Sequence, residues 1–100
     1  MDKDLQYRAM EKLLNSLVKP QFEKIIDDIK VVPYKGLFET PTVKVYLTPN
    51  LLHYVSVENS SDVSFEDIIE LTGNIEWKVS EALKHMGNPR HWIEFIQIQP

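Results

Sequence analysis

The stretch that most constrains the fold covers residues 42–57, TVKVYLTPNLLHYVSV. Its first six residues alternate a more polar row with an apolar row formed by Val43, Val45 and Leu47. A turn signal around Pro49 follows, and residues 51–57 are again rich in aliphatic and aromatic side chains. This pattern predicts a β-hairpin. Because a two-stranded hairpin is not stable alone, the remaining chain must add strands or a covering helix.

The first 32 residues are predicted to form a helical N-terminal segment. Apolar side chains recur there at helical spacing: Leu5, Met10, Leu13, Leu14 and Leu17, flanked by Tyr7 and Val18. This spacing predicts an amphipathic helix. Since proline is tolerated in a first helical turn, Pro20 is expected to begin a second helical piece that buries Phe22, Ile25, Ile26 and Ile29, or to kink one continuous helix. Residues 30–41 are expected to be an extended connector with at most a short edge strand.

Residues 64–86 admit two interpretations. In the first they form a helix bent at Gly73, which begins with a capping sequence at Ser64 and stops at Gly87 and Pro89. In the second, Thr72-Gly73-Asn74 is a turn between two strands, because residues 75–80 alternate apolar and polar side chains. The sequence alone does not choose between them. The end of the chain, residues 91–98, is dense in aromatic and β-branched side chains and predicts a strand with apolar residues on both faces.

Length and composition predict one domain over residues 1–100, with a β-rich core from residue 40 onward. A chain of 100 residues has a modest core, so self-association into a homo-oligomer is expected. The chain has no cysteine and no apolar run long enough to cross a membrane, which predicts a cytoplasmic protein without membrane contact. Its net charge of −4 disfavours non-specific binding to a polyanion but leaves room for a local basic patch.

With the second-hairpin interpretation, the chain resembles the Sm/LSm family, and its bacterial RNA-chaperone branch in particular. Residues 43–47 are similar to the first strand of that family, and residues 51–58 to its long second strand. The resemblance covers about residues 40–100 and continues with Asp62 and Phe65 ahead of the run Ile68-Ile69-Glu70-Leu71, a Lys84-His85 pair and a final aliphatic strand. It implies a small, strongly bent five-stranded barrel preceded by an amphipathic helical segment. It also implies ring closure between subunits and single-stranded RNA bound near the pore.

The chain departs from that family in several places. Tyr54 stands where the family usually has a glycine in the second strand, the link at residues 84–90 is longer, and so is the N-terminal helical region. The alternative fold is an α+β protein in the order α-β-β-α-β, with two helices on a three-stranded antiparallel sheet. That fold would serve as a structural or protein–protein interaction component with no nucleic-acid role.

No catalytic or cofactor signature stands out in the sequence. The histidines His53, His85 and His91 lack metal-ligand spacing, so no metal is expected. The carboxylates Asp62, Glu66, Asp67 and Glu70 fit a solvated acidic face better than a catalytic pair. The three glycines are isolated, so no phosphate-binding loop is expected. The sequence therefore predicts a protein that is not an enzyme and has no cofactor.

Residues 84–92 are where cationic and aromatic side chains are interleaved. Lysine and arginine bind phosphate, and histidine or tryptophan stacks on a base, which is the chemistry of single-stranded RNA binding. We expect an RNA site formed by Lys84, His85 and Arg90 of this segment, with Phe65 as an additional stacking surface. The competing interpretation is a helix C-terminus with favourable cations, followed by a loop and a core tryptophan.

Overall fold

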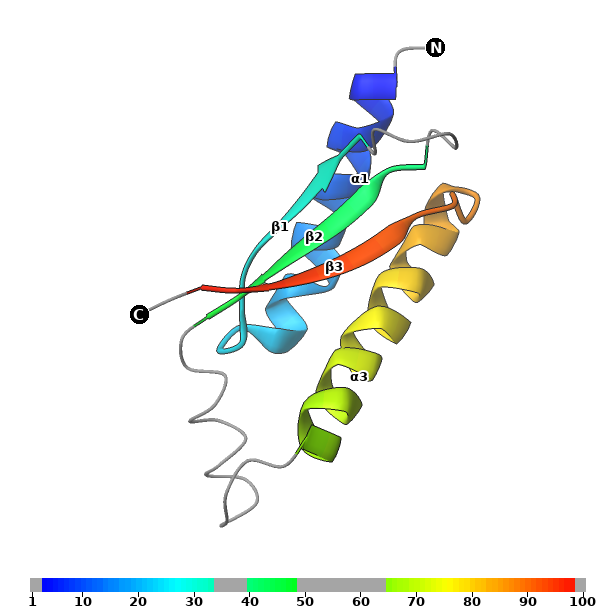
Figure 1. Ribbon diagram of the computed structural model, residues 1–100. Helices are drawn as coiled ribbons and strands as arrows, with labels where there is room; N and C mark the ends of the chain where they lie inside the picture. The colour runs from blue at the N-terminus through cyan, green and yellow to red at the C-terminus, as the bar shows by residue number, and fades with distance from the viewer. Residues whose placement is uncertain (1–2, 34–39, 49–64, 99–100) are drawn as a thin grey trace.

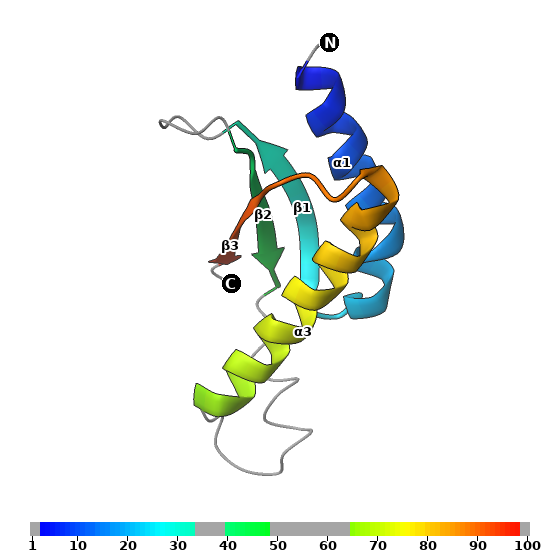
Figure 2. The ribbon, with the colours of Figure 1, turned by 90° about the vertical axis from the view of Figure 1, so that its right-hand side faces the viewer.

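The structure, a computed structural model, describes residues 3–33, 40–48 and 65–98. Its elements are α1 (Lys3–Leu17), the 3-10 turn η1 (Lys19–Phe22), β1 (Ile26–Val32), β2 (Thr42–Leu47), α3 (Phe65–Leu83), the 3-10 turn η2 (Lys84–Met86) and β3 (Trp92–Gln97). The strands form one sheet in the order β1-β2-β3, with β1 antiparallel and β3 parallel to β2 (Figure 1). Both helices lie on the same side of this sheet (Figure 2).

The predicted five-stranded Sm-like barrel is wrong, because the chain forms an open three-stranded sheet. Residues 65–83 are one helix, so Thr72-Gly73-Asn74 is not a turn between strands. The alternation at residues 75–80 misleads because only Ile75 and Val79, four residues apart, face the core, whereas Trp77 between them is 63% exposed. The barrel fails because it needs strands where this four-residue spacing favours a helix.

The alternative α-β-β-α-β order is confirmed, but its antiparallel sheet is only half right. β1 and β2 are antiparallel, whereas β2 and β3 are parallel. Two adjacent parallel strands need a long crossover, and α3 is the helical part of the connection between them.

The first helix is confirmed as α1, whose residues Tyr7, Met10 and Leu14 are buried. The second helical piece is wrong beyond the short η1 turn, because Ile26–Val32 is strand β1. A register irregularity between Ile26 and Asp28 places one extra residue in β1 opposite β2. Ile26 and Ile29 therefore share the buried face although they are three residues apart, a spacing that imitates a helix.

The first strand of the predicted hairpin is confirmed as β2, but its antiparallel partner in the sheet is β1. The predicted second strand, residues 51–57, lies outside the described residues. The final strand is confirmed as β3. The predicted helix stop is also confirmed: Gly87 has a left-handed backbone with φ of 80°, and its N–H donates to the carbonyl of Lys84 at 3.2 Å.

One core holds the two layers together. It consists of buried apolar side chains from both helices, from Val18 just after α1 and from the helix-facing side of the sheet: Met10, Leu14, Val18, Ile26, Ile29, Val43, Val45, Ile75, Val79 and Leu83. α1 also covers the outer edge of β1. Its Glu11 Oε1 accepts the N–H of Val31 at 2.9 Å, and its Asn15 Nδ2 donates to the carbonyl of Ile29 at 2.8 Å. These bonds satisfy backbone groups that an edge strand would leave to water or to another chain.

Neither of the helices in the described ranges combines the length and apolar character that crossing a membrane requires.

Candidate nucleic-acid interface

The sheet has one face that the helices leave uncovered, and we call it the open face. Both helices lie on one side of the sheet (Figure 2). Because Ile29, Val43 and Val45 are buried beneath the helices, the side chains that alternate with them point to the opposite side. The strand register arranges these side chains in three rows across the sheet: Val32, Thr42 and Trp92; Lys30, Lys44 and Glu94; and Asp28, Tyr46 and Ile96. The open face thus carries two aromatic side chains among charged ones.

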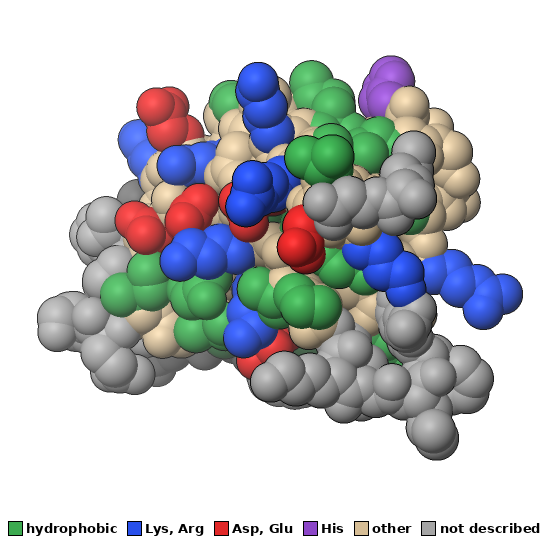
Figure 3. All heavy atoms as spheres, turned by 90° about the horizontal axis from the view of Figure 1, so that it is seen from above, with side chains coloured by type: hydrophobic (Ala, Val, Ile, Leu, Met, Phe, Trp, Pro, Cys, Tyr) green, Lys and Arg blue, Asp and Glu red, His purple; other side chains and the backbone are tan. Residues whose placement is uncertain are grey.

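Cations and rings are in contact on this face. The Nζ atom of Lys30 lies 5.5 Å from the centre of the Tyr46 ring, within the range of a cation–π interaction. Lys30 and Lys44 are direct neighbours in the sheet, and their repulsion is offset by Glu94, the neighbour of Lys44 on β3. Viewed from the N-terminal end of α1, Figure 3 shows basic, acidic and apolar side chains side by side rather than a continuous basic surface.

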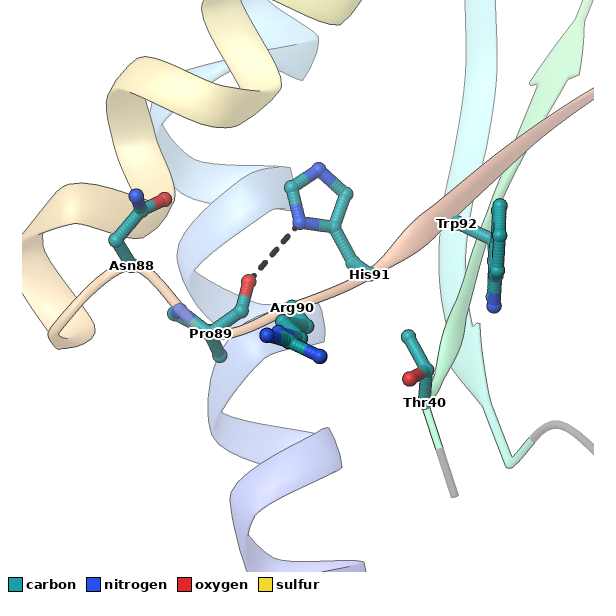
Figure 4. A pocket seen from close by; sticks show the side chains of 6 residues that line it. All are labelled: Thr40, Asn88, Pro89, Arg90, His91 and Trp92. Atoms are coloured by element: carbon teal, nitrogen blue, oxygen red, sulfur yellow. Dashed lines mark hydrogen bonds between the residues drawn. The ribbon is translucent and has the colours of Figure 1, made fainter. Parts of the chain in front are cut away.

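A hollow opens beside the open face where the chain enters β3. It is lined by Thr40, Asn88, Pro89, Arg90, His91 and Trp92, has a volume of about 480 Å³, and is called the Arg90 hollow below (Figure 4). The turn after η2 supplies Asn88 and Pro89 to the lining, and in this turn Gly87 and Asn88 both have left-handed backbones. The Nδ1 atom of His91 lies 3.1 Å from the carbonyl oxygen of Pro89, and because a carbonyl only accepts, Nδ1 carries the proton.

A second depression adjoins the Arg90 hollow. It has a volume of about 420 Å³ and runs toward the first turns of α1, where it is lined by Lys3, Gln6 and Tyr7. The two share Thr40, Pro89 and Arg90. Arg90 therefore stands between two connected concave surfaces.

The four residues predicted to bind RNA are not brought together. Lys84 lies over the exposed ring of Trp77, with its Nζ 5.9 Å from the ring centre. His85 lines a separate depression with residues of α1, η1 and α3, and this depression shares no residue with those at Arg90. Phe65 begins α3, at the opposite end of the helix from Lys84, and its side chain lies outside the described part of the structure.

Arg90 is the predicted residue that adjoins the open face. The sequence interpretation missed Lys30, Lys44 and Tyr46 as its companions. A signal for two of them was present, because Lys44 and Tyr46 form the polar row of the strand that was predicted correctly. Lys30 could not be placed beside them, since its strand was interpreted as a helix followed by a connector.

The histidines and carboxylates considered in the sequence form no candidate metal or catalytic site within the described ranges. They contain no group of three or more histidine, cysteine, aspartate or glutamate side chains that could hold a metal ion. Among the carboxylates considered above, Glu70 is exposed on α3, and the side chains of Asp62, Glu66 and Asp67 lie outside the described residues, as do His53 and Tyr54.

No family model, curated protein or solved structure matches the chain.

Proposed function

We propose that this protein binds single-stranded RNA on the open face of its sheet, with Arg90 at one end of the binding surface. The observation that carries the proposal is the residue Trp92, which is 56% exposed, lies beside Arg90 and is on the same face as Tyr46 and Lys44. Aromatic rings on a sheet stack on unpaired bases, and neighbouring lysine and arginine side chains bind the phosphates. A closed ring of subunits has no part in this proposal, because the sheet is open.

The charges of this face favour salt-sensitive binding of moderate strength. Lys30, Lys44 and Arg90 supply the positive charge, and Asp28 and Glu94 oppose it. The net charge of −4 repels a polyanion at long range, so attraction depends on the local cations. Single strands are favoured over duplexes because stacking on Trp92 and Tyr46 needs unpaired bases.

Titration of a labelled single-stranded RNA, followed by fluorescence anisotropy at several salt concentrations, tests the proposal. If all three cations contact phosphates, the logarithm of affinity falls with the logarithm of salt with a slope of about −2 for single strands. Arg90→Ala is expected to weaken binding and to make the slope less steep by about 0.7. Lys78→Ala is the matched control, because Lys78 lies on α3, away from the open face, and pairs with Glu81 at 3.9 Å.

Equal effects of the two variants, or no RNA binding at low salt, would refute the proposal. The second candidate is then a protein partner, either another protein or a second copy of this chain. The acidic side chains on the open face and the partly buried Ile96 among them favour this candidate. A protein partner on this face would lose affinity in a Trp92→Ala variant but not in Lys78→Ala.

A further inference from the structure

We infer that the Arg90 hollow is a subsite for a single nucleotide, which stacks its base on Trp92 and places its phosphate against Arg90. This inference rests on the proposed RNA binding and goes further, since it predicts that a free nucleoside monophosphate binds here without the rest of a strand. The volume of about 480 Å³ lies within the range of small-molecule sites. A flat sheet surface alone would bind an oligonucleotide but hold a mononucleotide poorly.

The backbone at the entry to β3 brings the two main groups together. In an extended chain, residues two apart point to the same side, so Arg90 and Trp92 lie on one side of the chain at the hollow, and His91 between them also contributes to its lining. Figure 4 shows this arrangement, with Arg90 between Pro89 and Thr40 and the Trp92 ring next to Thr40. The hydrogen bond of His91 to the Pro89 carbonyl spans Arg90 and restrains the backbone at that residue.

Polar groups for the edge of a base are also present. The Thr40 hydroxyl and the Asn88 side-chain amide both line the hollow, and together they offer donors and acceptors. The backbone around them is restrained: the Trp92 N–H donates to the carbonyl of Pro41 at 2.9 Å, and Pro41 and Pro89 each have a fixed φ. A site built on restrained backbone loses little conformational entropy when a ligand binds.

The two aromatic residues of the open face differ in their exposure. Tyr46 is only partly exposed, and the Nζ atom of Lys30 lies 5.5 Å from the centre of its ring. Trp92 is 56% exposed. The first base is therefore expected at Trp92, and the strand then extends over Lys44 toward Tyr46.

Tryptophan fluorescence tests the inference, because the chain has two tryptophans on different surfaces. Trp77 is exposed on α3, beside Lys84, and Trp92 lines the hollow. Trp77→Phe leaves Trp92 as the reporter, and Trp92→Phe leaves Trp77 as the matched control. Each full-length variant is titrated with adenosine 5′-monophosphate, with adenosine and with a single-stranded RNA oligonucleotide, after circular dichroism shows an unchanged fold.

We expect the monophosphate to quench the Trp92 reporter and to leave the Trp77 reporter unchanged. In the Trp92 reporter, Arg90→Ala should lower the affinity for the monophosphate by about fivefold and leave the affinity for adenosine unchanged. Only the monophosphate offers a charged partner to the guanidinium. Lys78→Ala should change neither. Equal quenching of both reporters, or equal effects of Arg90→Ala on both ligands, would overturn the inference.

The same titrations separate the subsite from the proposed function. If the oligonucleotide quenches Trp92 and the monophosphate does not, the single-nucleotide subsite is wrong and RNA binding on the open face stands. If neither ligand quenches Trp92, both are wrong.

Discussion

Replacing Gly73 with alanine should stabilise this protein, although the sequence around Gly73 resembles a turn. Gly73 lies in the interior of α3, on the exposed side, and its φ is not positive. A Cβ added there meets no atom within 4 Å. The substitution therefore introduces no clash and no strain, and its effect comes from the backbone freedom that glycine loses on folding.

The expected gain is about 0.5–1 kcal/mol, the difference between glycine and alanine inside a helix. For a domain of 60–100 residues, each kcal/mol shifts the melting temperature by about 4–8 °C, so Gly73→Ala should raise Tm by roughly 2–8 °C. Gly87→Ala is the matched control. Its φ of 80° is left-handed, a conformation that costs an L-residue about 1–2 kcal/mol, so Tm should fall.

Thermal unfolding followed by circular dichroism at 222 nm, checked by urea denaturation, measures both variants. We expect changes in Tm of opposite sign, although both substitutions replace glycine with alanine. If Gly73→Ala lowers the free energy of unfolding by as much as Gly87→Ala does, Gly73 needs a turn conformation. The second-hairpin interpretation of residues 64–86 would then be right and α3 would be wrong.

Two further predictions concern the core and the covered edge of the sheet. Leu14→Ala should cost about 2–5 kcal/mol of unfolding free energy because Leu14 is fully buried, whereas Leu17→Ala, at a site 41% exposed, should cost clearly less in the same urea titration. Glu11→Ala should cost about 1–3 kcal/mol because it leaves the part-buried N–H of Val31 without its acceptor. Glu11→Gln keeps an oxygen there and should cost less, and equal losses would show that this hydrogen bond does not matter.

Elements with an uninterrupted period could be predicted from the sequence. α1 and β2 follow one period, β3 is dense in aromatic and β-branched residues, and the structure confirms all three. For α3 the sequence alone admits both a helix and a hairpin, because both periods fit part of it. The burial of the side chains decides between them: Ile75, Val79 and Leu83 form one buried stripe at four-residue spacing, whereas Trp77 is exposed and takes no part in the core.

The candidate site was harder to predict from the sequence than the fold, because it combines residues from three strands. Arg90 could be singled out by its position between cationic and aromatic neighbours in the chain. Its spatial companions, Lys44 and Lys30, depend on the register of β2 with β3 and with β1. Register follows from which strands pair, and a pattern within one segment does not contain that information.

The register irregularity in β1 explains why the sequence predicts a second helical piece where the structure has a strand. It also supplies a test. Ile26 pairs with Leu47 and Asp28 with Tyr46, so the exposed Asp27 is the extra residue of the bulge. Deleting Asp27 would place Ile26 and Ile29 two residues apart, which is the spacing of an ordinary strand, with both still facing the core. We therefore expect the deletion variant to fold with the same sheet.

Deleting Lys30 instead is the control for this variant. It would move Val31 and the residues after it to the opposite face of the sheet, because side chains alternate in a strand. Val31 is buried and pairs with Val43, so this deletion should strongly destabilise the protein. Urea denaturation of the two variants compares them directly. Equal damage from both deletions would mean that Asp27 is a needed part of the strand, and that the helical spacing of Ile26 and Ile29 has a cause other than the bulge.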